Sequence, residues 1–211
     1  MPHQRVDNTT IDQLLQQLRH PVWRVRRNAV IALGHTKRIE SIPALLDALG
    51  DFDPQDEDSK VIMSAGNALC EIGEPALIPL IDALQKQADH PHDAWRRYWV
   101  ADTLGIFGDR RAVEPLIAAL ADPETREGAA EALGHLGDPQ ALEPLRRLYS
   151  ALTSADGYVY RAIGWAIRDI QTAIAPHPLP LRKEDVQLLV ALLGIAQSSD
   201  ETSDNSRSHT P

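Results

Sequence analysis

Two tryptophans four residues apart are the side chains of this sequence best placed to bind a ligand or a partner. On a helix, Trp95 and Trp99 lie one turn apart on the same face. Exposed aromatic groups of this kind are typical of surfaces that bind a partner or a ligand. The neighbouring residues that would share such a site are His92, Arg96 and Tyr98. The alternative interpretation is that the insert at residues 87–93 folds back and covers both rings.

A second candidate group lies near the end of the helical part of the chain. It consists of Tyr158 and Arg161, with Tyr160 and Trp165 close by. Because Tyr160 and Trp165 are five residues apart, they do not share one narrow helical stripe. Packing of these rings against a closing helix is therefore favoured, and ligand binding is the alternative.

Residues suited to metal or covalent chemistry are sparse. The histidines are scattered and no His-Glu dipeptide occurs, so the sequence predicts no metal site. His90 and His92 share one segment, for which a solvated loop is the favoured interpretation. Cys70 has no visible histidine partner, and no phosphate-binding glycine loop or Gly-x-Ser-x-Gly motif is present. We assign no catalytic residue and no reaction.

The elements that would position these residues form an internal repeat. Leu104-Gly105 matches Leu133-Gly134, and Gly108-Asp109 matches Gly137-Asp138, an offset of 29 residues from 104 to 133. Leucines recur at 33, 69, 104 and 133, and each precedes a proline, at 43, 79, 115 and 144. A fixed period of this size is the signature of stacked helical hairpins. We call these leucines the anchor leucines.

The shared register is what makes the two tryptophans unusual. They lie nine and five residues before the anchor Leu104. The equivalent residues in the other units are Arg24 and Asn28, Lys60 and Ser64, and Glu124 and Gly128. We interpret these as solvent-facing choices, so large aromatic rings at the same positions indicate a binding patch.

Composition and pattern predict an all-α fold. Apolar residues make up 43% of the chain and aromatic residues only 5%, with alanine and leucine most frequent. We expect one domain over 1–196, opened by a capping helix at 11–18 and ended by a closing helix at 183–196. Its repeats are expected at about 20–50, 57–88, 92–121, 122–150 and 154–196. Residues 197–211 have nothing apolar to bury and are expected to be a disordered tail.

The repeat resembles a known family. The segments Val25-Arg26, Ala29 and Ala32-Leu33-Gly34 resemble HEAT repeats of the short bacterial type found in phycobilisome-lyase-like (E/F-type bilin lyase) proteins. The same pattern recurs around the anchor leucines Leu104 and Leu133. Unit two departs from it, with Ile62 in the arginine place and Cys70 in the glycine place.

The resemblance implies a right-handed α-solenoid of about five helical hairpins, with the second (B) helix of each hairpin lining a concave surface. It also implies two functional hypotheses. The first is a protein–protein interaction module or assembly chaperone, which holds its partner on the B helices, including Arg111 and Arg146, and on the aromatic patch. The alternative is a subunit of an E/F-type phycobilin lyase or another phycobiliprotein-handling factor. No cofactor is expected except a phycobilin under the lyase hypothesis.

Charge and hydropathy narrow the range of partners. A net charge of −9 argues against nucleic acid, because that affinity comes from cations. The most apolar stretch, 188–196, is far too short to span a membrane. The N-terminus lacks a signal-peptide pattern, and a single cysteine suits a reducing compartment, so we expect a cytoplasmic protein. Its partner is expected to be another protein, such as a phycobiliprotein or a second HEAT-repeat subunit.

One recurring cation is interpreted as structural. Arg26, Arg97 and Arg126 occupy the same place in the first helix of their units. We expect each to pair with an acid of a neighbouring unit, such as Asp109 or Asp138.

Overall fold

The computed structural model describes residues 8–56, 59–86 and 91–174, with the backbone alone at 8, 9, 91 and 92. Every regular element within these ranges is helical. The α-helices are α1 (Asn8–Gln17), α2 (Trp23–Thr36), α3 (Ile42–Ala48), α4 (Lys60–Ile72), α5 (Leu77–Gln85), α6 (Pro91–Phe107), α7 (Val113–Ala119), α8 (Arg126–Leu136), α9 (Leu142–Ala151) and α10 (Gly157–Ile174). Short 3-10 turns precede α3, α5, α7, α9 and α10: η1 (Ile39–Ser41), η2 (Glu74–Ala76), η3 (Arg110–Ala112), η4 (Pro139–Ala141) and η5 (Ser154–Asp156).

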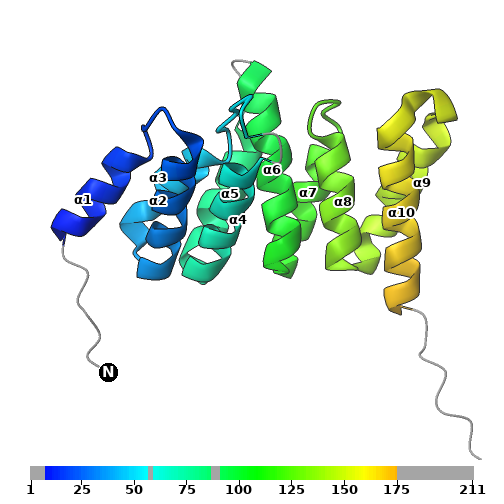
Figure 1. Cartoon of the computed structure of the whole chain (residues 1–211). Helices are drawn as coiled ribbons and strands as arrows, with labels where there is room; N and C mark the ends of the chain where they lie inside the picture. The colour runs from blue at the N-terminus through cyan, green and yellow to red at the C-terminus, as the bar shows by residue number, and fades with distance from the viewer. Residues whose placement is uncertain (1–7, 57–58, 87–90, 175–211) are drawn as a thin grey trace, which may run out of the picture. The chain divides into compact units, whose positions relative to one another are not determined.

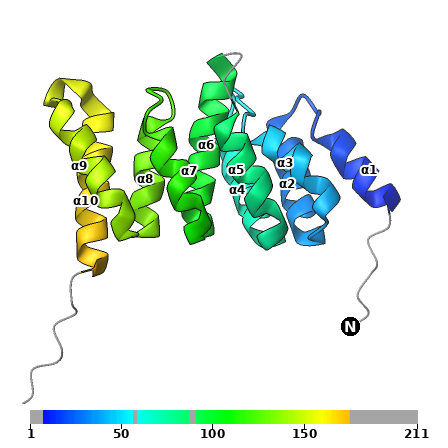
Figure 2. The ribbon, with the colours of Figure 1, turned by 180° about the vertical axis from the view of Figure 1, so that it is seen from behind.

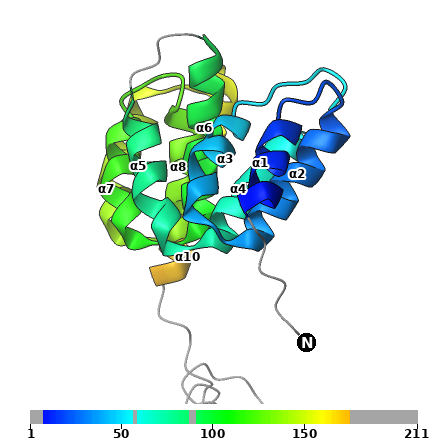
Figure 3. The ribbon, with the colours of Figure 1, turned by 90° about the vertical axis from the view of Figure 1, so that its left-hand side faces the viewer.

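The helices pair into hairpins that follow one another in chain order (Figures 1 and 2). We call α2, α4, α6, α8 and α10 the A helices and α3, α5, α7 and α9 the B helices. Each A helix packs on the next A helix, and each B helix packs on the A helix of the following hairpin. Viewed from the α1 end, α2 lies on one side and α5 and α7 lie on the other (Figure 3). This arrangement is an all-α solenoid with α1 packed on its first A helix.

The anchor leucines form the centre of the core. Leu33, Leu69, Leu104 and Leu133 are all 0% exposed, as the register of the repeat predicts. The B helices start at an equally buried small residue, which is Ala76, Ala112 and Ala141 in three units and Ser41 in the first. The hairpins therefore share one packing scheme from α2 to α9.

The Gly-Asp turns work by backbone geometry. Gly108 and Gly137 end α6 and α8 with φ of 74° and 63°, a conformation that favours glycine. The next residue caps the following turn, because Asp109 Oδ1 accepts a hydrogen bond from the Arg111 amide at 2.9 Å. Asp138 does the same for the amide of Gln140 at 3.0 Å. The Gly-Asp pairs in the sequence are thus helix stop and start signals.

The glycine after the anchor leucine brings neighbouring A helices together. A Cβ atom on Gly34 would lie 2.7 Å from the Ala68 Cβ, and one on Gly105 would lie 2.7 Å from the Ala132 Cα. Unit two has the half-buried Cys70 at this place. How closely neighbouring A helices can approach here therefore depends on the size of one residue per unit.

The recurring arginines have different partners from those expected. Arg26 pairs with Asp51 and Asp53, at 2.6 and 2.8 Å, in the loop after its own hairpin. Arg97 pairs with Asp122 at 2.7 Å, again after its own hairpin. The guanidinium groups also donate to backbone carbonyls of the preceding loop or helix end, at His20 and Pro21 for Arg26, Leu84 for Arg97, and Leu120 and Ala121 for Arg126.

The expected pairing with Asp109 or Asp138 is therefore wrong. Asp109 pairs with Arg111 at 2.8 Å, and Asp138 pairs with Arg110 at 2.6 Å. The position of an arginine in the repeat predicts which face of its helix it occupies. Which loop lies opposite that face depends on how the hairpins pack.

One predicted boundary differs from the structure, and two predicted segments lie outside the described residues. Helix α6 begins at Pro91, so residues 92 and 93 belong to its first turn instead of the predicted 87–93 loop. The predicted closing helix at 183–196 and the tail at 197–211 lie outside the described residues. Among the helices that are described, none is both long and apolar enough to cross a membrane.

Candidate functional site

The tryptophans of α6 form a three-ring cluster with the tyrosine between them. Trp95 and Tyr98 are nearly parallel, with ring centroids 5.9 Å apart and an interplanar angle of 9°. Trp99 meets Trp95 edge-on at 5.7 Å and Tyr98 edge-on at 5.4 Å. Such offset and edge-to-face arrangements are the favoured geometries of aromatic pairs. We call Trp95, Tyr98 and Trp99 the aromatic cluster.

The next A helix makes room for this cluster. A Cβ atom on Gly128 of α8 would lie 2.9 Å from Tyr98 Cδ2, so only glycine lets the ring pack this closely. The Tyr98 hydroxyl donates to Glu131 Oε2 at 2.9 Å, which fixes the direction of the ring. Burial raises the pKa of Tyr98, and the hydrogen bond and charge of Glu131 raise it further.

Gly128 also corrects the interpretation of the register. The residue five places before the anchor leucine is buried in unit four, so this position does not face solvent in every unit. The aromatic cluster and the glycine of the following repeat are two parts of one packing arrangement. Neither residue alone reveals it in the sequence.

A pocket of about 540 Å³ lies between the N-terminal half of α6 and the start of α8 with the loop before it. It is lined by Ala94, Trp95, Tyr98, Trp99, Glu124 and Glu127. Trp95 is 40% exposed and Trp99 is half-buried, with its Nε1 atom buried and without a hydrogen-bond acceptor among the described residues. Burial raises the pKa of Glu127, and the charge of Glu131 acts in the same direction. The lining of the pocket therefore contains both aromatic rings and the carboxyl groups of Glu124 and Glu127.

The predicted arginines do not line this pocket. Arg96, predicted beside the tryptophans, pairs with Asp93 at 2.8 Å and Asp47 at 3.4 Å. Arg111 is exposed and pairs with Asp109 and with Glu74, the latter at 3.2 Å. Arg146 is exposed on α9, and the side chain of His92 is outside the described atoms.

The second sequence-predicted group lies on α10. The guanidinium of Arg161 lies over the ring of Tyr158, 4.4 Å from its centroid, and 5.9 Å from the centroid of Trp165. Tyr158 and Trp165 are 71% and 50% exposed. Tyr160 instead stacks on Tyr149 of α9 at 4.4 Å. The proposed packing against a closing helix stays a prediction, because that helix is outside the described residues.

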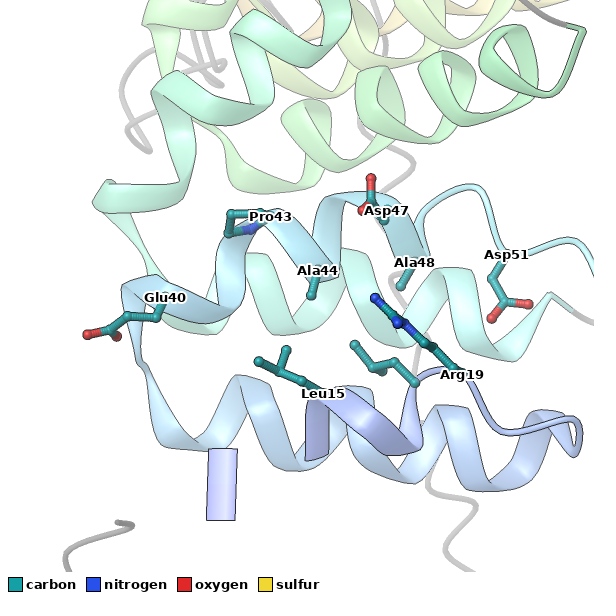
Figure 4. Close-up of a pocket in the computed structure, with 9 residues that line it drawn as sticks. Leu15, Arg19, Glu40, Pro43, Ala44, Asp47, Ala48 and Asp51 are labelled. Atoms are coloured by element: carbon teal, nitrogen blue, oxygen red, sulfur yellow. The ribbon is translucent and has the colours of Figure 1, made fainter. Parts of the chain in front are cut away.

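A hollow that the sequence analysis missed lies between α1 and α3 (Figure 4). It has a volume of about 540 Å³. Its lining is Leu15, Leu18, Pro43, Ala44 and Ala48, with the charged side chains of Arg19, Glu40, Asp47 and Asp51. In Figure 4, Leu15 and Arg19 extend from the α1 side toward Ala44 and Ala48.

A smaller hollow of about 170 Å³ continues this surface between α3 and α5. It shares Pro43 and Asp47 with the first hollow and also reaches Lys86 and Arg96. The small residues of α3 are a weak sequence signal for the larger hollow, since Ala44 and Ala48, which line it, are one turn apart on the helix. The hollow also depends on the position of α1 relative to α3, and no residue pattern in either helix predicts that position.

The described residues contain no group of three or more histidine, cysteine or acidic side chains that could hold a metal ion. Burial raises the pKa of Cys70 to about 11, with a further contribution from the charge of Asp102. At neutral pH the thiol is therefore protonated, and a protonated thiol is a poor nucleophile.

Stacked A and B helices around one continuous core define an α-solenoid repeat protein. The chain belongs to the HEAT-repeat family, because a family model described as HEAT repeats matches residues 11–105, 53–124 and 81–168, together more than half of the chain. No curated protein matches the chain. Among solved structures, it is similar to human deoxyhypusine hydroxylase in complex with glycerol, at 21% identity and a TM-score of 0.45, over 79% of this chain and 75% of that one.

Proposed function

We propose that this chain is a non-catalytic module, a scaffold or assembly chaperone, that binds a partner protein along its B helices. The observation that carries the proposal is the pair of hollows that share Pro43 and Asp47 and run from α1 across α3 to α5. HEAT repeats commonly serve protein–protein interaction, which supports this class of function.

The lining of the hollows suits a segment of a protein. Leucine, proline and alanine side chains provide apolar surface, while Glu40, Asp47 and Arg19 surround it with charges of both signs. An apolar centre with a polar rim is the usual anatomy of a protein interface. Two exposed arginines add to the charged surface of the later units: Arg111 lies in the turn η3 before α7, not in the B helix as predicted, and Arg146 lies in α9.

The lyase alternative has weaker support. A bilin carries propionate groups, for which stacked aromatic rings and nearby arginines would be complementary. The aromatic pocket instead contains Glu124 and Glu127, whose charges repel propionates. Arg96 and Arg111 pair with acids elsewhere. Mixing the protein with phycocyanobilin and recording its visible spectrum tests this alternative, and a bound-bilin band that Trp95→Ala abolishes would revive it.

The binding proposal is tested by site-specific photo-crosslinking in cells. A crosslinking residue replaces Glu40, which is exposed and lines the larger hollow, or Met63, which is 55% exposed on α4. We expect a discrete protein adduct at 40 and none at 63. Adding Ala44→Trp, which fills the hollow, should remove the adduct. Equal adducts at both positions, or one that survives Ala44→Trp, would contradict the proposal.

A further inference from the structure

We infer that the pocket between α6 and α8 receives a single positively charged side chain, a lysine or an arginine, carried by the partner protein. The inference rests on the proposed function and names the chemistry of a second contact, separate from the hollows on the B helices. Its basis is the meeting of the aromatic cluster with Glu124 and Glu127.

The pocket offers accessible aromatic faces. The faces of indole and phenol rings are electron-rich and attract cations within about 6 Å of the ring centre. The parallel rings of Trp95 and Tyr98 line the pocket, and Trp95 is 40% exposed. A guanidinium or ammonium group entering the pocket would therefore meet aromatic surface directly.

The charge of the pocket lining also favours a cation. Glu124 is exposed and Glu127 is half-buried, and no lysine or arginine is among the described residues that line the pocket. A neutral occupant would displace water from the Glu127 carboxylate without offering it an ion pair, and such desolvation costs free energy. A cation would instead pair with the carboxylate while it displaces water.

At two other aromatic sites, cations of the chain itself lie over the rings. Arg24 and Lys60 lie over Trp23 at 4.6 and 5.4 Å, and Arg161 lies over Tyr158. Within the described part of the chain, no cation lies over a ring of the aromatic cluster.

Arg161 is the cation whose charge acts most directly on this pocket, since it lowers the pKa of Glu127. Its guanidinium is 4.4 Å from the Tyr158 centroid, on α10, and so is engaged outside the pocket. It offsets part of the acidic charge without filling the space beside Trp95.

The test uses three short peptides that differ at one side chain: acetyl-Gly-Lys-Gly-amide, its trimethyllysine form, and its norleucine form, which keeps the alkyl chain and lacks the charge. Binding is followed by the NMR signals of the indole N–H groups of the chain's four tryptophans. We expect both cationic peptides to shift the Trp95 and Trp99 signals at concentrations about tenfold lower than norleucine requires. Trp23 and Trp165 serve as internal controls.

The variants separate charge from shape. Glu124→Gln with Glu127→Gln should weaken binding of the lysine peptide about tenfold, and Trp95→Leu should reduce it at least as much. Glu71→Gln, at an exposed carboxylate on α4, should change nothing. Circular dichroism confirms that each variant is folded.

The inference is overturned if norleucine binds as well as lysine, if the shifts are absent or occur only at Trp165, or if the double glutamine variant binds unchanged. Failure of the crosslinking at Glu40 would leave these peptide results intact, because the two experiments report on different surfaces.

Discussion

Single residues in this chain are explained by comparing equivalent positions in the repeat. Ser41 shows this most clearly, because it is 0% exposed and its hydroxyl has no hydrogen-bond partner among the described residues. The equivalent residues Ala76, Ala112 and Ala141 are also 0% exposed. Unit one therefore buries a hydroxyl at a place where the other units bury a methyl group, and an unpaired buried hydroxyl is unfavourable.

We predict that Ser41→Ala stabilises the protein. Removing the unpaired hydroxyl should raise the free energy of unfolding by about 1 kcal/mol, measured by urea denaturation. The slope of free energy against urea concentration should stay the same, since the fold is unchanged. A loss of stability would mean that the hydroxyl has a partner in solution.

Neighbouring A helices approach closely where a contact residue is glycine and has no Cβ atom. Gly34, Gly105 and Gly134 each place a helix backbone against an alanine of the next A helix. In unit two the half-buried Cys70 takes this place, and the α4 glycine that lies against α6 is Gly66, where an added Cβ would lie 2.9 Å from Thr103 Oγ1. The glycine contact with the next A helix is thus one turn earlier in this unit.

We predict that Gly105→Ala destabilises the protein although alanine is the better helix former. The added methyl group would lie 2.7 Å from the Ala132 Cα, and overpacking against backbone outweighs the gain in helix propensity of about 1 kcal/mol. We expect a net loss of about 2 kcal/mol in the free energy of unfolding.

Cys70→Ala is the matched control for that experiment, because it places the same side chain at the equivalent position of unit two. Because Cys70→Ala removes a sulfur atom, it cannot overpack the interface, and we expect an effect of less than about 1 kcal/mol. A loss in Gly105→Ala no larger than this would contradict overpacking against Ala132.

At the scale of the whole stack, stability is a sum over hairpins and over the interfaces between neighbours. The α4–α6 interface has Cys70 in place of the glycine that lies against an alanine at the other A-helix interfaces, so we expect it to be the weakest link between α1–α5 and α6–α10. Cys70 lies half-buried there, near the charge of Asp102. Breaking this interface should uncouple the two sides before it unfolds either.

We predict that Gly66→Leu makes the two sides exchange backbone hydrogens independently. The larger side chain cannot fit against Thr103, so amides of α2–α5 should exchange several-fold faster while those of α8–α10 keep their rates. Hydrogen–deuterium exchange with mass spectrometry resolves the two groups. Met63→Leu, on the exposed side of the same helix, should leave both unchanged. Uniform acceleration across all helices would contradict a weak central interface.

The sequence by itself determined the hairpins and their core. Leucines in a fixed register, Gly-Asp turns and prolines in the first turns of the second helices act within a few residues of each other, so local physics suffices to predict them. It also singled out Trp95 and Trp99, although it treated Gly128 as solvent-facing.

Only the tertiary structure decided what these helices present to one another. The contact of Tyr98 with Gly128, the partners of Arg97 and the hollow between α1 and α3 each join residues that are distant in the sequence. Such contacts depend on the spacing and angle between helices, which are set by packing over the whole interface. A periodic pattern in the sequence predicts on which face of its helix a residue lies. Which residues contact that face is determined only by the packing of the helices.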